Sequence, residues 1–321
     1  MTCKCNTFVI RAQGCRLGRV AGDALGSLVE FQTPEQIRQE YPNGVRELVD
    51  GGTWNTIAGQ PTDDSEMALL LARMLVDQRK HDQEEARKAY VYWLDSGPFD
   101  CGMTVSRGLR GRLNPDSQAN GAMMRISPLG ILEANHDLQQ VAEWAKQDAA
   151  LTHPHPVCLQ ANALFAMAIA HAIRTRIGAQ DLHDQIVLWA DEMDADHSLM
   201  EVITGSAEAP PEDYVHQQAW ILIAFRNALW QLLHPLNLEE AIVDTVMRGG
   251  DTDGAISAAL LGAVCGREAI PEQWIGRLLN CRPAAGQAHV RHPRLECFWP
   301  VVALILAKQL LSCTRTKNME V

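Results

Sequence analysis

The sequence predicts an all-α protein built as one multi-helix domain. Apolar residues recur with the 3.6-residue period of a helix along most of the chain, whereas the two-residue alternation of a half-buried strand is hard to find. The 321 residues would suffice for two domains, but no connection has the length or low complexity of an interdomain linker. We therefore expect one domain over residues 11–312, with short tails at 1–10 and 313–321.

The first expected helix covers residues 15–31 and carries a row of glycines. Gly18, Gly22 and Gly26 recur every four positions, which places a bare stripe on one helix face. Because glycine is unfavourable inside helices, the stripe predicts that a second helix packs closely against it.

The next strong helical pattern is Ser65–Gln78, an amphipathic stretch whose start is marked by Thr62, Asp63 and Asp64. Further helices are expected over 82–95, 138–150, 157–176, 180–193, 214–233, 238–247, 254–265, 271–280 and 299–311. The most apolar of these, at 157–176 and 299–311, are interrupted by polar residues, so we expect buried helices and no membrane span.

The composition describes a folded, mildly acidic protein, with 47% hydrophobic residues and a formal net charge of −11 at pH 7. Non-specific binding to nucleic acid or to an anionic membrane requires a cationic surface, so neither partner is expected. The nine cysteines contain no CxxC pair, and the N-terminus lacks a signal-peptide pattern, which predicts a reducing, cytoplasmic location. Cys3 and Cys5 are expected to be surface thiols and not metal ligands.

Two acidic clusters share an arrangement at the start of an apolar helix: Thr62-Asp63-Asp64, and Asp251-Thr252-Asp253 after two glycines. Helix capping would explain one carboxylate in each cluster but not the doubling, because neighbouring carboxylates repel. Four carboxylates from two helix ends would need a cation if the ends met in the fold. Oxygen ligands without His or Cys select hard ions such as Mg²⁺ or Mn²⁺, so the clusters suggest a two-metal site.

These residues also resemble a known family. The segments 22–26 (GDALG), Glu30-Phe31, 61–65 (PTDDS) and 249–253 (GGDTD) occur in the order found in the ADP-ribosylglycohydrolase family, and the resemblance covers residues 11–270. The resemblance implies an orthogonally packed all-α domain with two divalent cations at the bottom of a cleft. Thr62, Asp63 and Asp64 would bind them from one side, and Asp251 and Asp253 from the other. Gly254 departs from the family, where many members have Thr or Ser.

Residues 99–104 (FDCGMT) resemble an element of the dinitrogenase reductase-activating type of this family. There the aspartate is the usual candidate for proton transfer, so Asp100 is our first candidate for a catalytic residue; a turn aspartate is the alternative. Glu30 matches the position of a glutamate that serine-specific relatives place near the metals. A solvated carboxylate at a helix end is the alternative for Glu30.

Other segments match parts of the family that border the substrate cleft. Residues 120–125 (NGAMMR) and the pair Thr152-His153 resemble such segments, and Tyr214 falls where relatives have an aromatic residue covering the substrate, although a surface tyrosine is the alternative. His155 is expected, like His153, to be a pocket wall or a helix cap and not a metal ligand. Trp54 stacks on a base or covers the core; the sequence does not decide between these roles. The resemblance thus assigns substrate binding to Asn120, Gly121, Met123, Arg125, Thr152, His153 and Tyr214.

The expected activity is metal-dependent hydrolysis of N-linked ADP-ribosyl-arginine on a modified protein, with acidic residues at the cleft mouth attracting the cationic substrate. Serine-linked ADP-ribose or a small ADP-ribosyl metabolite is the nearest alternative. A protein of the same family that binds and neutralises an ADP-ribosylating toxin is the non-enzymatic alternative. A two-metal phosphohydrolase is disfavoured because no HD pair or HxH accompanies the acidic motifs.

Overall fold

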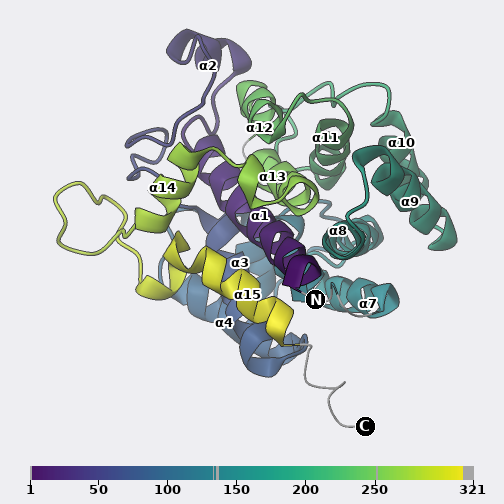
Figure 1. Ribbon diagram of the computed structural model, residues 1–321. Coiled ribbons are helices and arrows are strands. Elements are labelled where there is room, and N and C mark those ends of the chain that lie inside the picture. The colour runs from purple at the N-terminus through teal and green to yellow at the C-terminus, as the bar shows by residue number, and fades with distance from the viewer. Residues whose placement is uncertain (1, 133, 135–136, 251, 314–321) are drawn as a thin grey trace.

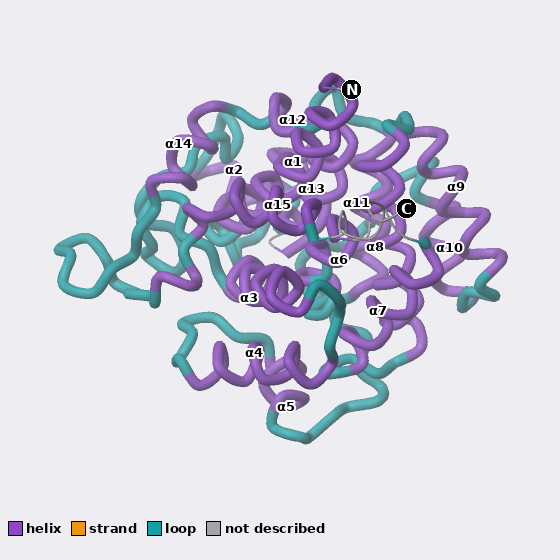
Figure 2. The backbone as a smooth tube through the Cα atoms, turned by 60° about the horizontal axis from the view of Figure 1, so that its bottom comes forward, coloured by secondary structure: helices purple, strands orange, loops and turns teal. Residues whose placement is uncertain are grey.

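The computed structural model describes residues 2–132, 134, 137–250 and 252–313, and within these residues it contains helices and no strand (Figures 1 and 2). Two isolated bridges, Gly51 with Thr56 and Ala119 with Trp220, join loops. The α-helices are α1 (Thr2–Gly26), α2 (Pro34–Glu40), α3 (Asp63–Gln78), α4 (Gln83–Asp95), α5 (Met103–Leu109), α6 (Ser127–Leu132), α7 (Leu138–Ala150), α8 (Pro156–Thr175), α9 (Ala179–Glu192), α10 (His197–Gly205), α11 (Ile221–Leu233), α12 (Leu238–Met247), α13 (Thr252–Cys265), α14 (Glu272–Asn280) and α15 (Ala303–Ser312). Short 3₁₀ turns are η1 (Met123–Arg125), η3 (Arg267–Ala269), η4 (Glu296–Phe298) and η5 (Pro300–Val302). The all-α class is confirmed.

Several helix boundaries differ from the sequence-based expectations. Helix α1 begins at Thr2, so residues 2–10 are helical and not a tail, and it ends at Gly26 before Phe31 takes a positive φ of 64°. Helix α11 begins at Ile221, seven residues after the expected start at Tyr214. The helices α2, α5, α6 and α10 were not expected; each is too short for a hydrophobic period to stand out.

Helices α1 and α13 lie side by side through the centre of the molecule (Figure 1). A Cβ atom added to Gly18 would lie 2.4 Å from the carbonyl oxygen of Ala258, and one added to Gly22 would lie 2.3 Å from that of Gly254. The two backbones are therefore in direct contact, and no side chain fits between them. This confirms the close helix packing that the glycine stripe predicts.

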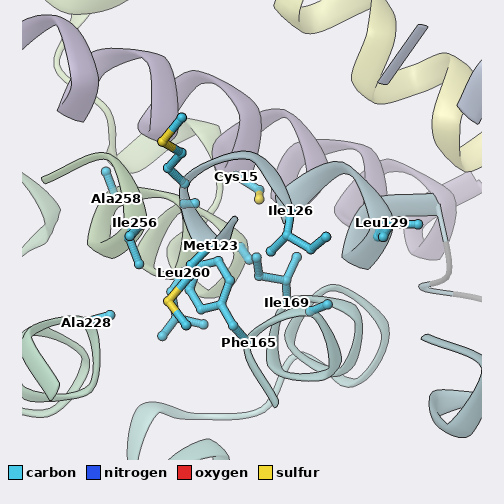
Figure 3. Close-up of a cluster of buried hydrophobic side chains, with 14 of the residues drawn as sticks. Cys15, Met123, Ile126, Leu129, Phe165, Ile169, Ala228, Ile256, Ala258 and Leu260 are labelled. Carbon is cyan, nitrogen blue, oxygen red and sulfur yellow. The ribbon is translucent and has the colours of Figure 1, made fainter. Parts of the chain in front are cut away.

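The hydrophobic core surrounds this helix pair. Figure 3 shows side chains from α1, η1, α6, α8, α11 and α13 converging, among them Cys15, Met123, Phe165, Ala228 and Leu260. All of these side chains are buried. The elements that carry the acidic clusters, α3 and α13, thus extend from one continuous core, which limits how far their first turns can move relative to each other.

Helix α8 is the one helix among the described residues with the length and hydropathy of a membrane span. It has 20 residues, and 78% of its most apolar window is buried inside the protein. It packs against α7, α6 and α13. Its first turn is capped by His155, whose Nδ1 accepts a hydrogen bond from the amide of Val157 at 3.2 Å. Helix α8 is therefore a core helix, as its polar interruptions suggested, and His155 is a cap.

Candidate active site

A cavity of about 440 Å³ lies where the loops before α3, α5, η1 and α13 meet. Its walls include side chains that the sequence singled out from five separate segments: Glu30, Asp63, Asp100, Asn120 and His153. Thr252, at the start of α13, also lines it. The first acidic cluster and the start of the second therefore border one cavity, although they are far apart in the sequence.

The first acidic cluster is organised by a carboxylate from α1. Asp23 Oδ1 accepts hydrogen bonds from the amide and the hydroxyl of Thr62, at 3.0 and 2.8 Å. Asp23 Oδ2 accepts the amide of Ser65 at 3.0 Å. Asp23 therefore caps α3 from another helix and replaces the local cap, because the side chain of Thr62 makes no cap hydrogen bond within its own helix. The sequence analysis names Asp23 only as part of the GDALG segment. Its place as the single acid in a glycine-rich helix is the signal that could have indicated its role.

Asp64 lies below this cap and is fully enclosed. Its backbone carbonyl accepts a hydrogen bond from the guanidinium of Arg19, with Nη1 at 2.6 Å. Burial, together with the negative charges of Asp23 and Asp63, raises the pKa of Asp64 well above its ordinary value. Arg19 opposes this rise. The buried guanidinium of Arg19 thus lies next to a cluster of buried carboxyl groups.

Asp63 joins the cluster to the loop before α5. Its Oδ2 accepts the amide of Gly102 at 3.3 Å, and its carboxyl group hydrogen-bonds to that of Asp100. Burial and the charges of Asp63 and Glu30 raise the pKa of Asp100 to about 10. Two carboxyl groups that share a hydrogen bond hold a proton between them. Asp100 therefore lies in the cavity wall beside Asp63, not in an isolated turn.

Glu30 is buried, in contrast to the solvated carboxylate considered as its alternative. Its Oε2 accepts a hydrogen bond from the indole Nε1 of Trp54. Burial raises the pKa of Glu30 to about 7; the Trp54 bond lowers it, and the charge of Asp63 raises it further. The ring of Trp54 packs edge-on against Phe31 and Phe99, with centroids at 6.2 and 5.7 Å. Trp54 therefore orients Glu30 and, through Phe99, contacts the loop that carries Asp100.

The second acidic cluster is less connected. Asp253 is buried, and burial alone raises its pKa to about 8. Asp251, the other expected ligand from this cluster, lies outside the described residues. Gly254 faces α1: a Cβ there would lie 3.2 Å from the carbonyl oxygen of Gly22. The approach of α1 thus leaves little room for a side chain at position 254.

The carboxylates of both clusters fit a hard cation. Both Oδ atoms of Asp64 and Oδ1 of Asp253 are buried without a hydrogen-bond partner among the described residues. Buried carboxylate oxygens without donors are unfavourable unless a proton or a cation satisfies them. Among the residues that the structure describes, no three His, Cys, Asp or Glu side chains already form a metal site. The two-cation centre therefore stays a prediction.

A buried hydrogen-bond chain positions His153 at the cavity. Arg125 Nη1 donates to the carbonyl of Gly121 at 2.9 Å and to the hydroxyl of Thr152 at 3.0 Å. The Thr152 hydroxyl also lies 2.7 Å from His153 Nδ1, and this hydrogen bond fixes the orientation of the ring. Burial, reinforced by the charge of Arg125, lowers the pKa of His153 to about 3. Nε2 of the neutral ring is buried and has no protein partner among the described residues.

Two residues of the NGAMMR segment do not reach the cavity. Arg125 is fully buried and pairs with Asp148, with Nε 3.0 Å from Oδ1. Met123 is buried in the core, and Met124 lines the cavity in its place. Thr152 is buried behind His153 and is not part of the cavity lining. Arg125 and Thr152 thus position other residues of the site.

Tyr214 is buried and is not part of the cavity lining. Its hydroxyl donates to Asn227 Oδ1 at 2.6 Å, and the amide of Asn227 donates to Thr245 and Ser257. The structure therefore gives Tyr214 neither the substrate-covering role nor the surface role considered from the sequence. It anchors the segment before α11 to α12 and α13, and that segment supplies Gln218 and Ala219 to the cavity wall.

Comparison with known proteins identifies the family. The model of the ADP-ribosylglycohydrolase family matches residues 6–312. This chain belongs to the ADP-ribosylglycohydrolase family. The family membership confirms the resemblance seen in the motifs.

Several ADP-ribosylglycohydrolases cover most of the chain. It is 31% identical over 281 residues to the ADP-ribosyl-dinitrogen reductase glycohydrolase of Rhodospirillum rubrum, covering 84% of this chain and 90% of that protein. It is 25% identical to the ADP-ribosylarginine hydrolase Tri1 of Pseudomonas putida strain GB-1, covering 84% and 74%. A solved structure, an ADP-ribosylglycohydrolase-related protein complex, aligns with a TM-score of 0.78 and 26% identity, covering 96% of this chain and 99% of that one.

Proposed function

We propose that this chain is a divalent-cation-dependent hydrolase that releases ADP-ribose from ADP-ribosyl-arginine on a modified protein. The observation that carries the proposal is one cavity bordered by Asp63, Asp100 and Thr252, with unpartnered carboxylate oxygens of Asp64 and Asp253 buried in the same two helix starts. The names of two relatives, a dinitrogen reductase glycohydrolase and an ADP-ribosylarginine hydrolase, support the reaction class.

Two cations would be held by Thr62, Asp63 and Asp64 on one side and by Asp251 and Asp253 on the other. Bound Mg²⁺ or Mn²⁺ supplies Lewis acidity and an ordered water next to a ribose diol. Without cations, the same carboxylates repel one another and lie buried without donors, so the site is built to be neutralised.

The chain's own groups supply proton transfer and orientation. Asp100, hydrogen-bonded to Asp63, would protonate the guanidine nitrogen as it departs. Without that proton the nitrogen would have to leave as an anion, which makes it a poor leaving group. His153 also lines the cavity, where its hydrogen bond with the Thr152 hydroxyl orients the ring. Glu30, held by Trp54, is a second carboxylate at the cavity and is the residue that a serine-linked substrate would require.

The test is release of ADP-ribose from arginine-modified and serine-modified peptides, measured by mass spectrometry with Mg²⁺, with Mn²⁺ and with a chelator. Chelator-sensitive release from the arginine peptide is the expected result. Release from the serine peptide alone would contradict the arginine assignment and transfer the leading role to Glu30. A folded protein that binds ADP-ribose but releases none would contradict hydrolysis and favour a binding protein directed at an ADP-ribosylating toxin.

Asp100→Asn separates catalysis from binding in the same assay. The variant is expected to bind ADP-ribose and cations as the parent does but to lose about 10²–10⁴-fold in rate, the usual contribution of a positioned acid. An unchanged rate would assign proton transfer to another group. Circular dichroism of the variant provides the control for folding.

A further inference from the structure

The segment 106–118 projects from the rim of the cavity. The residues before it, through Val105, and the residues after it, from Ala119, both line the cavity wall. The hydroxyls of Thr104 and Ser117 lie 3.1 Å apart and tie its two ends together. Within the segment, α5 lies next to α4 and is followed by a surface loop (Figure 2). Any protein whose modified side chain enters the cavity must lie across or beside this segment.

Three arginines of this segment form what we call the basic rim: Arg107, Arg110 and Arg112. All three are exposed, and within the described part of the chain their side chains have no hydrogen bond or ion pair. The segment contains a single acid, Asp116. In a chain with a net charge of −11, a local concentration of unpaired positive charge is a departure from the rest of the molecule. The basic rim is therefore available to an anionic partner.

The basic rim is electrostatically close to the cavity. Cys101 lines the cavity, and the charge of Arg110 acts on its thiol: burial and the nearby Asp63 and Asp100 raise the pKa of Cys101 to about 12, while Arg110 opposes that rise. The mouth also presents the apolar side chains of Phe31 and Met103, which are 64% and 73% exposed. A partner at the mouth would contact apolar and cationic groups together.

We propose that the basic rim docks an acidic segment of the ADP-ribosylated protein next to its modified residue. This inference rests on the proposed function, because it requires a protein substrate. It reverses the expectation of an acidic cleft mouth: Glu30 and Asp63 lie buried inside the cavity, and the exposed segment at its edge is basic. The negative charges thus face the reacting end of the substrate, and the positive charges face the surface around it.

Each arginine of the basic rim is replaced by Glu to test the inference (Arg107→Glu, Arg110→Glu and Arg112→Glu together). The matched control makes the same total charge change at exposed cations elsewhere, Lys80→Glu, Arg277→Glu and Lys308→Glu. Both variants and the parent are assayed with two ADP-ribosyl-arginine peptides, flanked by Asp and Glu or by Gln, and with ADP-ribosyl-arginine itself. Assays at low and high salt show whether the preference is electrostatic.

The parent is expected to prefer the acidic peptide by about tenfold in kcat/KM at low salt, through KM, in the range of electrostatic steering. The rim variant loses this preference and keeps its rate on free ADP-ribosyl-arginine, while the control variant keeps the preference. Equal loss on all three substrates would overturn the inference, because the rim would then hold the diphosphate of ADP-ribose. A parent without flank preference would also overturn it, and a parent inactive on every substrate would overturn the proposed function as well.

Discussion

The two acidic helix starts look alike in the sequence but are built differently. At the start of α3, Asp63 and Asp64 are held by three groups from two other segments: Asp23 and Arg19 on α1, which cap the helix and bind the Asp64 carbonyl, and Asp100, which bonds to Asp63. At the start of α13, Asp253 has an unpartnered Oδ1 among the described residues, and its position depends on the backbone contact between α13 and α1.

The difference separates two ways of preparing a charged site. The α3 side is preorganised by hydrogen bonds and by a buried guanidinium, so its geometry persists whether or not a cation is bound. The α13 side is positioned sterically, by a helix contact with no room for side chains, and its carboxylate lacks a compensating charge. We therefore expect the α13 side to respond more to cation binding than the α3 side.

The largest expected effect comes from removing one carboxylate on each side. Asp64→Asn and Asp253→Asn should each reduce ADP-ribose release at least about 100-fold, as loss of an electrostatic group at a reacting centre does. Each should also abolish the increase in Tm that Mg²⁺ or Mn²⁺ gives the parent. Helix content by circular dichroism should remain near that of the parent. Full turnover in either variant would remove that residue from the cation site.

Gly22→Ala tests the steric half of the comparison. The added methyl would lie 2.3 Å from the carbonyl oxygen of Gly254, so α1 and α13 must separate. We expect a loss of about 2–3 kcal/mol in the free energy of unfolding, typical of overpacking, measured by urea denaturation. Gly276→Ala on α14 is the matched control, because a Cβ there has no neighbour within 4 Å; it should stabilise the protein by up to about 1 kcal/mol. Similar effects of the two changes would contradict the close contact.

Asp23→Ala tests the hydrogen-bonded half. It leaves the amides of Thr62 and Ser65 without their acceptor at the start of α3. Losing a cap costs about 1–2 kcal/mol, which urea denaturation would resolve. Asp82→Ala, which removes the exposed cap of α4, is the control for capping away from the site. Asp23→Ala should also weaken cation binding in calorimetry, and Asp82→Ala should not; an equal effect on both would deny Asp23 its organising role.

Gly254→Ser has the smallest expected effect. The new Cβ would lie 3.2 Å from the carbonyl oxygen of Gly22, a tight contact that small shifts relieve, so we expect less than about 1 kcal/mol of destabilisation. The hydroxyl would add an oxygen ligand next to Asp253, so cation affinity should rise severalfold. Calorimetric titration with Mn²⁺ measures the affinity. An unchanged affinity, in a variant as stable as the parent, would show that this position does not face the cation.

The sequence predicted those parts of the fold that depend on local pattern. The expected helices at 138–150 and 238–247 coincide with α7 and α12, and the glycine stripe correctly implied a close helix partner. Short helices such as α5 were missed because seven residues hold only two turns of a pattern. Met123, which the resemblance assigned to substrate binding, is buried in the core, and its neighbour Met124 lines the cavity.

A single sequence does not show which distant residue a side chain contacts. The resemblance assigns Arg125 to substrate binding, but its partner is Asp148, and only the tertiary structure brings the two together. The sequence likewise does not show that the hydroxyl of Tyr214 bonds to Asn227 on α11, away from the cavity. By contrast, Asp63, Asp100 and His153 all line one cavity, as the resemblance of their motifs to one family implied. The roles assigned to them stay predictions.

The contact between α1 and α13 also constrains how the chain folds as it is synthesised. Helix α1 leaves the ribosome well before α13, because more than 200 residues separate them in the chain. The glycine face of α1 therefore has no partner helix until α13 has been made. Contacts between distant parts of a chain form slowly, and exposed helix faces favour aggregation in the meantime. The same contact that positions the second acidic cluster thus delays completion of the core until α13 has been made.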